Sequence, residues 1–223
     1  MIMSQFPAPP HVDLAALRVD YSQRSLTETD IDADPVKTLQ LWIDQAIAAE
    51  ANEPNAMALA TSHDNRPGVR MVLLKAVDSG GLSFFTNYHS RKAVELDANA
   101  RAACVFWWPE LQRQVRVEGM VKRTSPEESA AYFNSRPPMS RLGSAASPQS
   151  QVLASREELE KRFEDLQGQY PRGNIPCPAH WGGYRLTPHL IEFWQGRLSR
   201  MHDRIECTLD QQSGKWIFKR LAP

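Results

Sequence analysis

Short apolar segments, each bounded by turn residues, constrain the fold of this chain more than any other feature. AMALAT (56–61), VRMVLLKAV (69–77) and LSFFT (82–86) are separated by HDNRPG (63–68) and by Ser79-Gly80-Gly81. Runs rich in β-branched and aromatic residues between Gly, Pro and Asn clusters are typical of strands joined by turns. These segments predict an antiparallel meander in which residues 69–77 form one continuous strand.

Further strand segments follow along the chain. ARAACVFWWP (100–109) and RQVRVEGMVKR (113–123) predict a strand pair around a turn at Glu110-Leu111, and residues 182–223 contain three more strand segments. The strand–helix alternation of a doubly wound sheet is missing, as is a Gly-rich phosphate loop. We therefore expect a mainly antiparallel β-barrel with flanking helices.

Capping residues and apolar spacing predict the helices. A helix begins at Asp34-Pro35, and a second runs from the cap Ser90 to about Asn99. Ser125 and Glu128 have the spacing of a capping box for residues 125–136, and residues 155–170 form a highly charged helix. The apolar face of the first helix comprises Val36, Leu39, Trp42, Ile43, Ala46 and Ile47. The Ser- and Pro-rich stretch 137–151 is expected to be a loop.

Bulk properties exclude several classes of protein. The chain has 223 residues, and its 26 basic and 26 acidic side chains cancel, so global charge gives no reason to expect nucleic-acid binding. No apolar run approaches the roughly 18 residues that span a bilayer, and the N-terminus lacks the pattern of a secretory signal. The widely spaced Cys104, Cys177 and Cys207 predict reduced thiols in a cytoplasmic protein, with no metal site. We expect one domain over residues 21–223, preceded by a flexible segment over residues 1–20.

Two basic clusters lie near strand ends. Arg70 and Lys75 point to opposite sides of an ideal strand, so only a twist or a bulge would bring both to one ligand. Arg91 and Lys92 stand in the first turn of a helix, where backbone N–H groups favour a phosphate. The alternative for each cluster is a set of solvated surface charges.

A third group of polar residues surrounds the end of the helix predicted over residues 125–136. Tyr132 and Arg136 are four residues apart and therefore share one helix face, and Ser140 follows shortly after. Together these side chains would make a phosphate clamp. The alternative is an ordinary helix end whose arginine counters the helix dipole.

The densest cluster is IEFWQGRLSRMHDR (191–204). A strand pattern leads into three arginines, a histidine and an aspartate within eight residues. Arg200 and His202 are two residues apart, which places them on the same side of an extended chain. Cationic and titratable groups at the end of a rigid strand suit an anionic substrate.

The pattern E-F-W-Q, four residues, then R-M-H-D-R closely resembles the C-terminal signature of pyridoxine (pyridoxamine) 5′-phosphate oxidases. R-M-V-L-L-K (70–75) and F-T-N-Y-H-S-R-K (85–92) are similar to flavin-binding segments of the same family, and the resemblance extends from about Leu17 to Pro223. It implies a split β-barrel flavoprotein that binds FMN and forms a homodimer with sites built from both chains. The implied reaction oxidises pyridoxine or pyridoxamine 5′-phosphate to pyridoxal 5′-phosphate, with O2 as acceptor and H2O2 as product.

The resemblance also implies roles for individual residues. The implied FMN contacts are Arg70, Met71, Val72, Leu73, Leu74, Lys75, Phe85, Thr86, Arg91, Lys92, Gln114, Gln149, Ser150, Trp194 and Arg204, with Gln149 and Ser150 reaching across from the partner subunit. The implied substrate contacts are Arg18, Tyr21, Lys75, Tyr132, Arg136, Ser140, Arg200 and His202, of which Arg200 and His202 are the catalytic pair. Arg18 and Tyr21 would belong to a lid, for which the alternative is a mobile amphipathic tail.

Other functions on the same scaffold stay open at this point. A related FMN oxidase of phenazine-type biosynthesis would act on a tricyclic acid, which has no need of a phosphate clamp. A non-catalytic flavin- or haem-binding function would not explain the R-M-H-D-R cluster. A second site that carries pyridoxal 5′-phosphate is compatible with the main hypothesis. The chain also departs from the family pattern at single positions, among them Arg141 in SRPPMSRLG, where relatives carry Gln.

Overall fold

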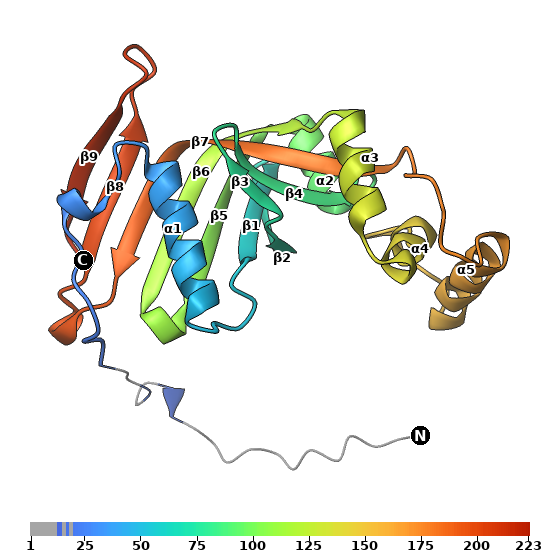
Figure 1. The fold of residues 1–223 in the computed structure, drawn as a ribbon, viewed down its shortest axis with the longest axis horizontal. Helices are drawn as coiled ribbons and strands as arrows, with labels where there is room; N and C mark the ends of the chain where they lie inside the picture. Colours follow the sequence, from blue (N-terminus) through green and yellow to red (C-terminus); the bar gives the residue numbers. More distant parts are fainter. Residues whose placement is uncertain (1–12, 15–16, 18–19) are drawn as a thin grey trace.

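A single antiparallel sheet forms the body of the protein (Figure 1). The computed structural model describes residues 13, 14, 17 and 20–223. Its strands are β1 (Ala56–His63), β2 (Arg66–Leu73), β3 (Ala76–Asp78), β4 (Gly81–Asn87), β5 (Arg101–Trp108), β6 (Arg113–Arg123), β7 (Trp181–Gln195), β8 (Asp203–Leu209) and β9 (Trp216–Leu221). The order is β2-β1-β5-β6-β7-β4-β3, while β8 pairs with β7 and β9 pairs with β8. Within the described residues no pairing joins β2 to β3, so the sheet is not closed.

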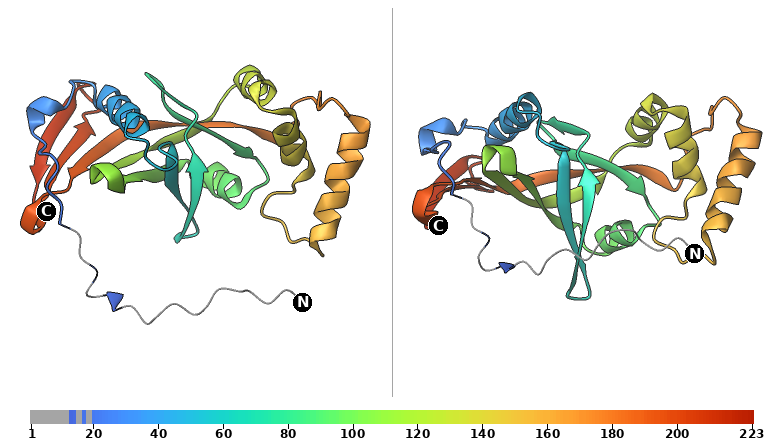
Figure 2. Two further views of the ribbon diagram at one scale, coloured as in Figure 1. Left: turned by 60° about the horizontal axis from the view of Figure 1, so that its bottom comes forward. Right: turned by 90° about the horizontal axis from the view of Figure 1, so that it is seen from below.

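Five helices flank the sheet in the described part of the chain. They are α1 (Pro35–Ala48), α2 (Arg91–Ala98), α3 (Pro126–Ser135), α4 (Pro138–Ala146) and α5 (Arg156–Gln169), with short 3-10 turns at η2 (Glu28–Asp30), η3 (Pro109–Leu111) and η4 (Leu198–Arg200). The helices α3, α4 and α5 gather at one end of the molecule, and β8 and β9 form the other end (Figure 2). The long strand β7 connects the two ends. No described helix has both the length and the apolar character needed to cross a membrane.

The core lies between α1 and the sheet. Leu39, Trp42 and Ala46 of α1 are buried in one cluster with strand residues such as Phe106 and Phe193, and Trp42 packs edge-on against Phe193 at 5.1 Å between ring centroids. The prediction for this helix was wrong at Ile47, which is 56% exposed. One residue turns the helix by about 100°, so Ile47 leaves the apolar face that Ala46 still belongs to.

The strand predicted over residues 69–77 is interrupted. β2 ends at Leu73, the Leu74 side chain turns into the core, and the Lys75 N–H donates to the Ser83 carbonyl at 2.8 Å. β2 therefore pairs with β1, whereas β3 pairs with β4 and β4 pairs with β7. The predicted meander was wrong here, because the chain crosses from one edge of the sheet to the other instead of returning beside itself.

The predicted loop over residues 137–151 contains α4. Pro138 occupies the start of this helix, where its missing N–H costs nothing. Leu142 and Ala146 are buried, and Leu142 packs in a second cluster with Phe133 and Trp181. Tertiary packing thus stabilises a helix that the Ser- and Pro-rich composition did not predict.

The helix α3 is capped by Ser125 as predicted, with the Glu128 N–H donating to its hydroxyl at 3.1 Å. The Glu128 carboxylate accepts a hydrogen bond from Arg185 at 2.7 Å and makes no bond back to the backbone of Ser125. Only one half of the predicted capping box is therefore present.

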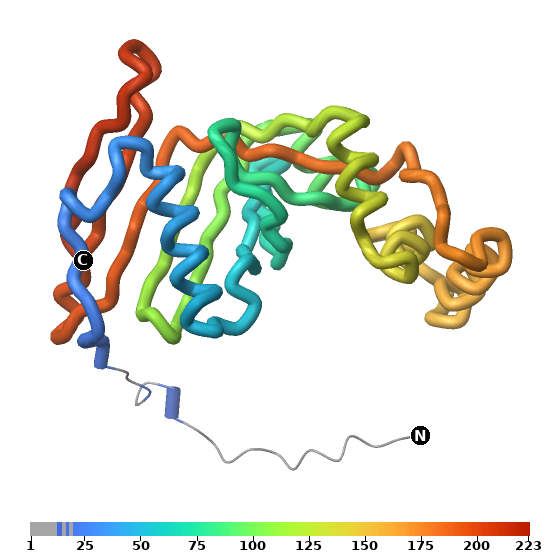
Figure 3. The backbone as a smooth tube through the Cα atoms, viewed as in Figure 1, coloured from blue at the N-terminus to red at the C-terminus, as the bar shows by residue number. Residues whose placement is uncertain are grey.

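The segment from Tyr21 to Leu26 runs beside the β8–β9 end of the sheet (Figure 3). The Ser22 N–H donates to the Gln112 side chain at 3.0 Å, and the Leu26 N–H donates to the Asp203 carboxylate at 3.0 Å. Both bonds lie on the C-terminal side of Tyr21 and attach the segment to the structure, close to the R-M-H-D-R cluster that contains Asp203.

Candidate active site

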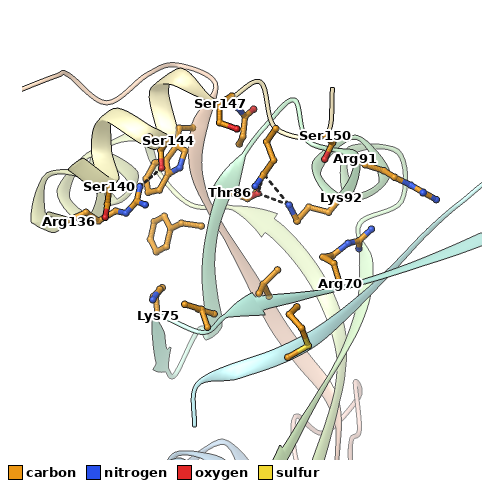
Figure 4. A pocket seen from close by; sticks show the side chains of 18 of the residues that line it. Arg70, Lys75, Thr86, Arg91, Lys92, Arg136, Ser140, Ser144, Ser147 and Ser150 are labelled. Atoms are coloured by element: carbon orange, nitrogen blue, oxygen red, sulfur yellow. Dashed lines mark hydrogen bonds between the residues drawn. The ribbon is translucent and has the colours of Figure 1, made fainter. Parts of the chain in front are cut away.

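A cleft of about 990 Å³ opens between β2, β4 and the helices α2, α3 and α4 (Figure 4). Most of the residues that the sequence implicated in FMN and phosphate binding line it: Arg70, Met71, Val72, Leu73, Lys75, Phe85, Thr86, Arg91, Lys92, Tyr132, Arg136, Ser140, Gln149 and Ser150. Its volume is at the upper end of the range of about 300–1,000 Å³ that is usual for small-molecule sites. Segments far apart in the sequence thus converge on one cavity.

The break after β2 brings Arg70 and Lys75 to the same cleft. Since the strand ends at Leu73, Lys75 is released from the alternation that would have directed it away from Arg70. Met71 and Leu73 lie between them and are 64% and 39% exposed, giving the cleft an apolar floor. Leu74 is buried in the core, so its side chain does not belong to the cleft wall.

Lys92 forms the centre of one end of the cleft. Its ammonium group lies 3.0 Å from Thr86 Oγ1, 3.3 Å from Ser90 Oγ and 3.2 Å from Gln149 Oε1, all neutral oxygens. Burial, reinforced by the charge of Arg70 and opposed by that of Glu95, lowers the pKa of Lys92 to about 8. A buried cation with neutral neighbours is suited to an anionic ligand, which would restore its ordinary pKa.

The opposite end of the cleft contains the predicted clamp. The Arg136 Nη1 donates to Ser144 Oγ at 2.7 Å, and the guanidinium lies over the Trp181 ring at 5.0 Å. Tyr132 stacks on Phe85 with 4.0 Å between ring centroids. Arg136 immediately follows α3 in extended conformation, and so is not on the helix face as predicted. Figure 4 shows Arg136 and Ser140 at one end of the cleft, and Arg70, Arg91 and Lys92 at the other.

Gln149 was expected to reach across from the partner subunit. In the structure its Oε1 accepts hydrogen bonds from Thr86 Oγ1 at 2.8 Å and from Lys92 Nζ of its own chain. The turn at Ser150, where φ is 70°, follows directly. The loop after α4 therefore closes the Lys92 end of the cleft from within the same chain.

Arg200 and His202 lie in a second cleft of about 580 Å³, which Tyr21 also lines. Arg200 belongs to the turn η4 and has a φ of 61°, next to Ser199 at 54°. The extended geometry predicted for this pair was therefore wrong. Two consecutive non-glycine residues in the left-handed region are sterically unfavourable, and such strain is typically found at functional sites.

The imidazole of His202 is fixed by several contacts. Its Nδ1 accepts a hydrogen bond from the Arg197 N–H at 3.1 Å. The ring packs against Trp194 at 4.6 Å and Tyr21 at 5.8 Å between centroids. Burial, followed by the charge of Arg200, lowers the pKa of His202 below its ordinary 6.5.

Gln114, Trp194 and Arg204 form a row across β6, β7 and β8, because Trp194 pairs in register with both of the others. Arg204 donates to the buried carboxylate of Glu192 at 2.8 Å. This row lies beside His202 and does not line the larger cleft of the same chain. Arg18 lies outside the described residues. The implicated residues thus occupy two separate regions of one protomer.

Two buried carboxylates next to these regions were not predicted. Glu95 contacts Arg70 and Arg91, and Glu192 contacts Arg204. The spacing of four residues between Arg91 and Glu95 was a signal for one of these contacts. The others join separate strands and helices, which no local pattern reveals.

Two family models match separate parts of this chain. Residues 43–170, more than half of the chain, match the family model for pyridoxamine 5′-phosphate oxidase. The chain belongs to this family. Residues 181–223 also match the model for the pyridoxine 5′-phosphate oxidase C-terminal dimerisation region, which contains β7, β8, β9 and the R-M-H-D-R cluster.

Individual known proteins are similar to this chain over nearly their whole length. The pyridoxine/pyridoxamine 5′-phosphate oxidase of Acaryochloris marina is 52% identical over 96% of this chain and 98% of its own. The crystal structure of PhzG from Burkholderia lata, in complex with tetrahydrophenazine-1-carboxylic acid, has a TM-score of 0.85 and 30% identity, covering 91% of this chain and all of that one. A pyridoxamine 5′-phosphate oxidase-related, FMN binding protein from Nostoc punctiforme shares the fold, with a TM-score of 0.67 and 18% identity over 90% of this chain and all of that one. The split β-barrel expected from the sequence is confirmed, as an open antiparallel sheet with flanking helices.

Proposed function

We propose that this chain is an FMN-dependent oxidase that converts pyridoxine or pyridoxamine 5′-phosphate to pyridoxal 5′-phosphate, with O2 as acceptor and H2O2 as product. One observation supports the proposal above all: the larger cleft has cationic groups at both of its ends. Lys92 lies at one end with Arg70 and Arg91, and Arg136 lies at the other. A cofactor phosphate and a substrate phosphate each need such an end. The name and 52% identity of the relative from Acaryochloris marina support the same reaction.

The residues of the Lys92 end fit FMN. Lys92, Arg91 and Thr86 would hold its phosphate, and the exposed apolar side chains of Met71 and Leu73 offer a surface for an aromatic ring. When bound, FMN supplies the electron-accepting chemistry that amino-acid side chains lack. The protein contributes binding, orientation and exclusion of water.

The Arg136 end would hold the phosphate of the substrate, with Lys75, Tyr132 and Ser140 completing the clamp. Anchoring of the phosphate restricts the substrate ring to one orientation, which replaces a bimolecular encounter by a positioned one. The phenazine-type alternative has support from the similarity to PhzG at 30% identity. A clamp for phosphate is superfluous for a tricyclic acid, so the geometry favours the phosphorylated vitamin.

We infer that Arg200 and His202 act on a substrate held by the partner protomer. The two clefts of one chain are separate, and the match to a dimerisation region supports assembly of a homodimer. Val69 and Met71 on β2 are 71% and 64% exposed, an apolar surface suited to burial in such an interface. Arg200 would orient and polarise the group that is oxidised, and His202 would hold the ring from its Nε2 side.

The N-terminal segment also contributes to the second cleft. Tyr21 lies next to His202, which supports a covering role for the N-terminal segment over the substrate. The three cysteines are free thiols, which supports a reducing compartment and therefore a cytoplasmic location. The partners are the phosphorylated vitamin, O2 and a second copy of the chain.

An aerobic assay tests the proposed reaction. Purified protein loaded with FMN is given pyridoxine 5′-phosphate, and the aldehyde product and peroxide are followed together. The proposal expects both to appear in equal amounts. A yellow protein that forms neither product would contradict the oxidase reaction and favour the phenazine-type or non-catalytic alternative.

A further inference from the structure

Glu95 is a buried carboxylate that connects two arginines of the cofactor end of the cleft. It lies on α2 and is 5% exposed. Its Oε2 lies 2.7 Å from Arg70 Nη2 on β2, and its Oε1 lies 2.8 Å from Arg91 Nε on its own helix. Each carboxylate oxygen therefore holds one arginine, and the two arginines come from different elements of the fold.

Thr61 and Gly68 complete this arrangement. They lie opposite each other in the β1–β2 pair, and the Thr61 hydroxyl donates to Glu95 Oε2 at 2.5 Å while accepting from Arg70 Nη1. A Cβ atom at Gly68 would be 2.8 Å from Arg70 Nη2 and 3.1 Å from both Glu95 oxygens. The strand pair thus leaves just enough room for the Arg70 guanidinium to lie against the carboxylate.

Glu95 has two opposing effects on an anion at this end of the cleft. Its negative charge lies close to the arginines and repels a phosphate, which by itself weakens binding. It also restricts the two long side chains, and Arg91 in particular, which is 68% exposed and has no other hydrogen-bond or ion-pair partner among the described residues. Because the two arginine side chains are already restricted before the ligand binds, less conformational entropy is lost on binding. Lys92 makes no hydrogen bond to Glu95, so its charge stays available to the ligand.

We propose that Glu95 is a positioning residue that holds Arg70 and Arg91 in the orientation required by the phosphate of FMN, and that this effect outweighs its repulsion of the phosphate. The inference rests on the proposed FMN site. It assigns a favourable role in anion binding to an acidic residue, the opposite of what its charge alone predicts.

The two effects predict opposite changes of FMN affinity for one substitution, Glu95→Gln. In Glu95→Gln the shape is retained and the negative charge is lost, but the amide N–H2 faces one of the two arginines and releases it. Positioning predicts that the dissociation constant for FMN rises by about 10-fold or more, the range for loss of a charged hydrogen bond. Electrostatic repulsion alone predicts that it falls.

Riboflavin, which lacks the phosphate, distinguishes a loss of phosphate binding from general damage to the fold. General damage would weaken the binding of both flavins, whereas a loss of phosphate binding would weaken only that of FMN. Both dissociation constants are measured on the apoprotein by quenching of flavin fluorescence. We expect Glu95→Gln to change riboflavin affinity less than about 2-fold, the effect of a remote substitution, while FMN affinity falls. Unchanged or tighter FMN binding, or equal losses for FMN and riboflavin, would overturn the proposal.

Two further variants complete the experiment. Gly68→Ala keeps the charge of Glu95 and crowds Arg70, so it should weaken the binding of FMN more than that of riboflavin. This variant tests the proposal if Glu95→Gln does not fold. Glu160→Gln is the matched control, since it removes an exposed carboxylate paired with Arg156 four residues away, outside the cleft. A wild-type protein that binds no FMN would instead refute the proposed function itself, before any variant is compared.

Discussion

The backbone N–H of Arg197 donates a hydrogen bond to Nδ1 of His202 over 3.1 Å. A backbone N–H can only donate, so Nδ1 carries no proton and the neutral ring has its proton on Nε2. Burial and the charge of Arg200 lower the pKa of His202, which keeps the neutral form dominant at pH 7. His202 therefore presents a hydrogen-bond donor to its cleft at neutral pH, and Nδ1 is not free to act as a base.

The titration of His202 should depend on Arg200. In the wild-type protein the imidazole should titrate below its ordinary 6.5, and Arg200→Ala should raise the pKa toward 6.5, because a nearby positive charge is removed. The ring C–H resonances of His202, followed by NMR against pH, measure both values. An unchanged or lower pKa in Arg200→Ala would contradict the electrostatic coupling.

Arg200→Ala should affect turnover far more than FMN binding. We expect kcat/KM to fall by about 100-fold or more, as for loss of a charged contact to the reacting group, with the FMN dissociation constant changed less than about 2-fold. Steady-state kinetics and flavin fluorescence give the two quantities. Arg156→Ala, at an exposed arginine on α5, is the control. Comparable losses of turnover and FMN affinity in Arg200→Ala would remove the proposed catalytic role.

FMN binding should weaken as pH rises through about 8. The pKa of Lys92 is lowered to about 8 in the free protein, so above this pH the apoprotein loses the ammonium charge. A bound phosphate favours the charged form and raises this pKa, so binding then requires uptake of a proton. The dissociation constant should increase by up to about 10-fold per pH unit above pH 8. Lys92→Met should bind more weakly at pH 7 and lose this pH dependence; a variant that kept it would assign the titration to another group.

We expect the clamp around Arg136 to bind the phosphate of the substrate and not the phosphate of FMN. Arg136→Met should raise KM for pyridoxine 5′-phosphate by about 10-fold or more, because a charged hydrogen bond is lost. Its FMN affinity should stay close to that of the wild type, since Arg136 and Lys92 lie at different ends of the cleft. Unphosphorylated pyridoxine serves as the comparison: the ratio of kcat/KM for the two substrates should fall in the variant. A constant ratio would exclude contact with the phosphate.

A mixture of two inactive variants should regain activity if each site is built from both protomers. Lys92→Met disables the large cleft, and Arg200→Ala disables the second cleft of the same chain. In a mixed dimer, one of the two sites then combines an intact Lys92 with an intact Arg200. After unfolding and refolding of an equal mixture, random pairing should restore about a quarter of the wild-type activity. Sites contained within single chains would show no recovery.

The sequence by itself determined the features that depend on neighbours along the chain. The alternation in residues 113–123 and the cap at Ser125 predicted β6 and the start of α3, because strand and helix periodicities are local properties. The contiguous clusters Arg91-Lys92 and R-M-H-D-R were equally visible. Their resemblance to one family was confirmed by the match over residues 43–170, which contains the first cluster, and by the match over residues 181–223, which contains the second.

Only the tertiary structure decided the features that depend on packing between distant segments. The helix α4 formed where composition predicted a loop, since Leu142 gains burial beside Phe133 and Trp181. The break after Leu73 placed Lys75 in the same cleft as Arg70, and the register that sets Thr61 opposite Gly68 created the space in which Glu95 holds two arginines. Sheet register and burial arise from contacts between residues far apart in the sequence, and no local period encodes them.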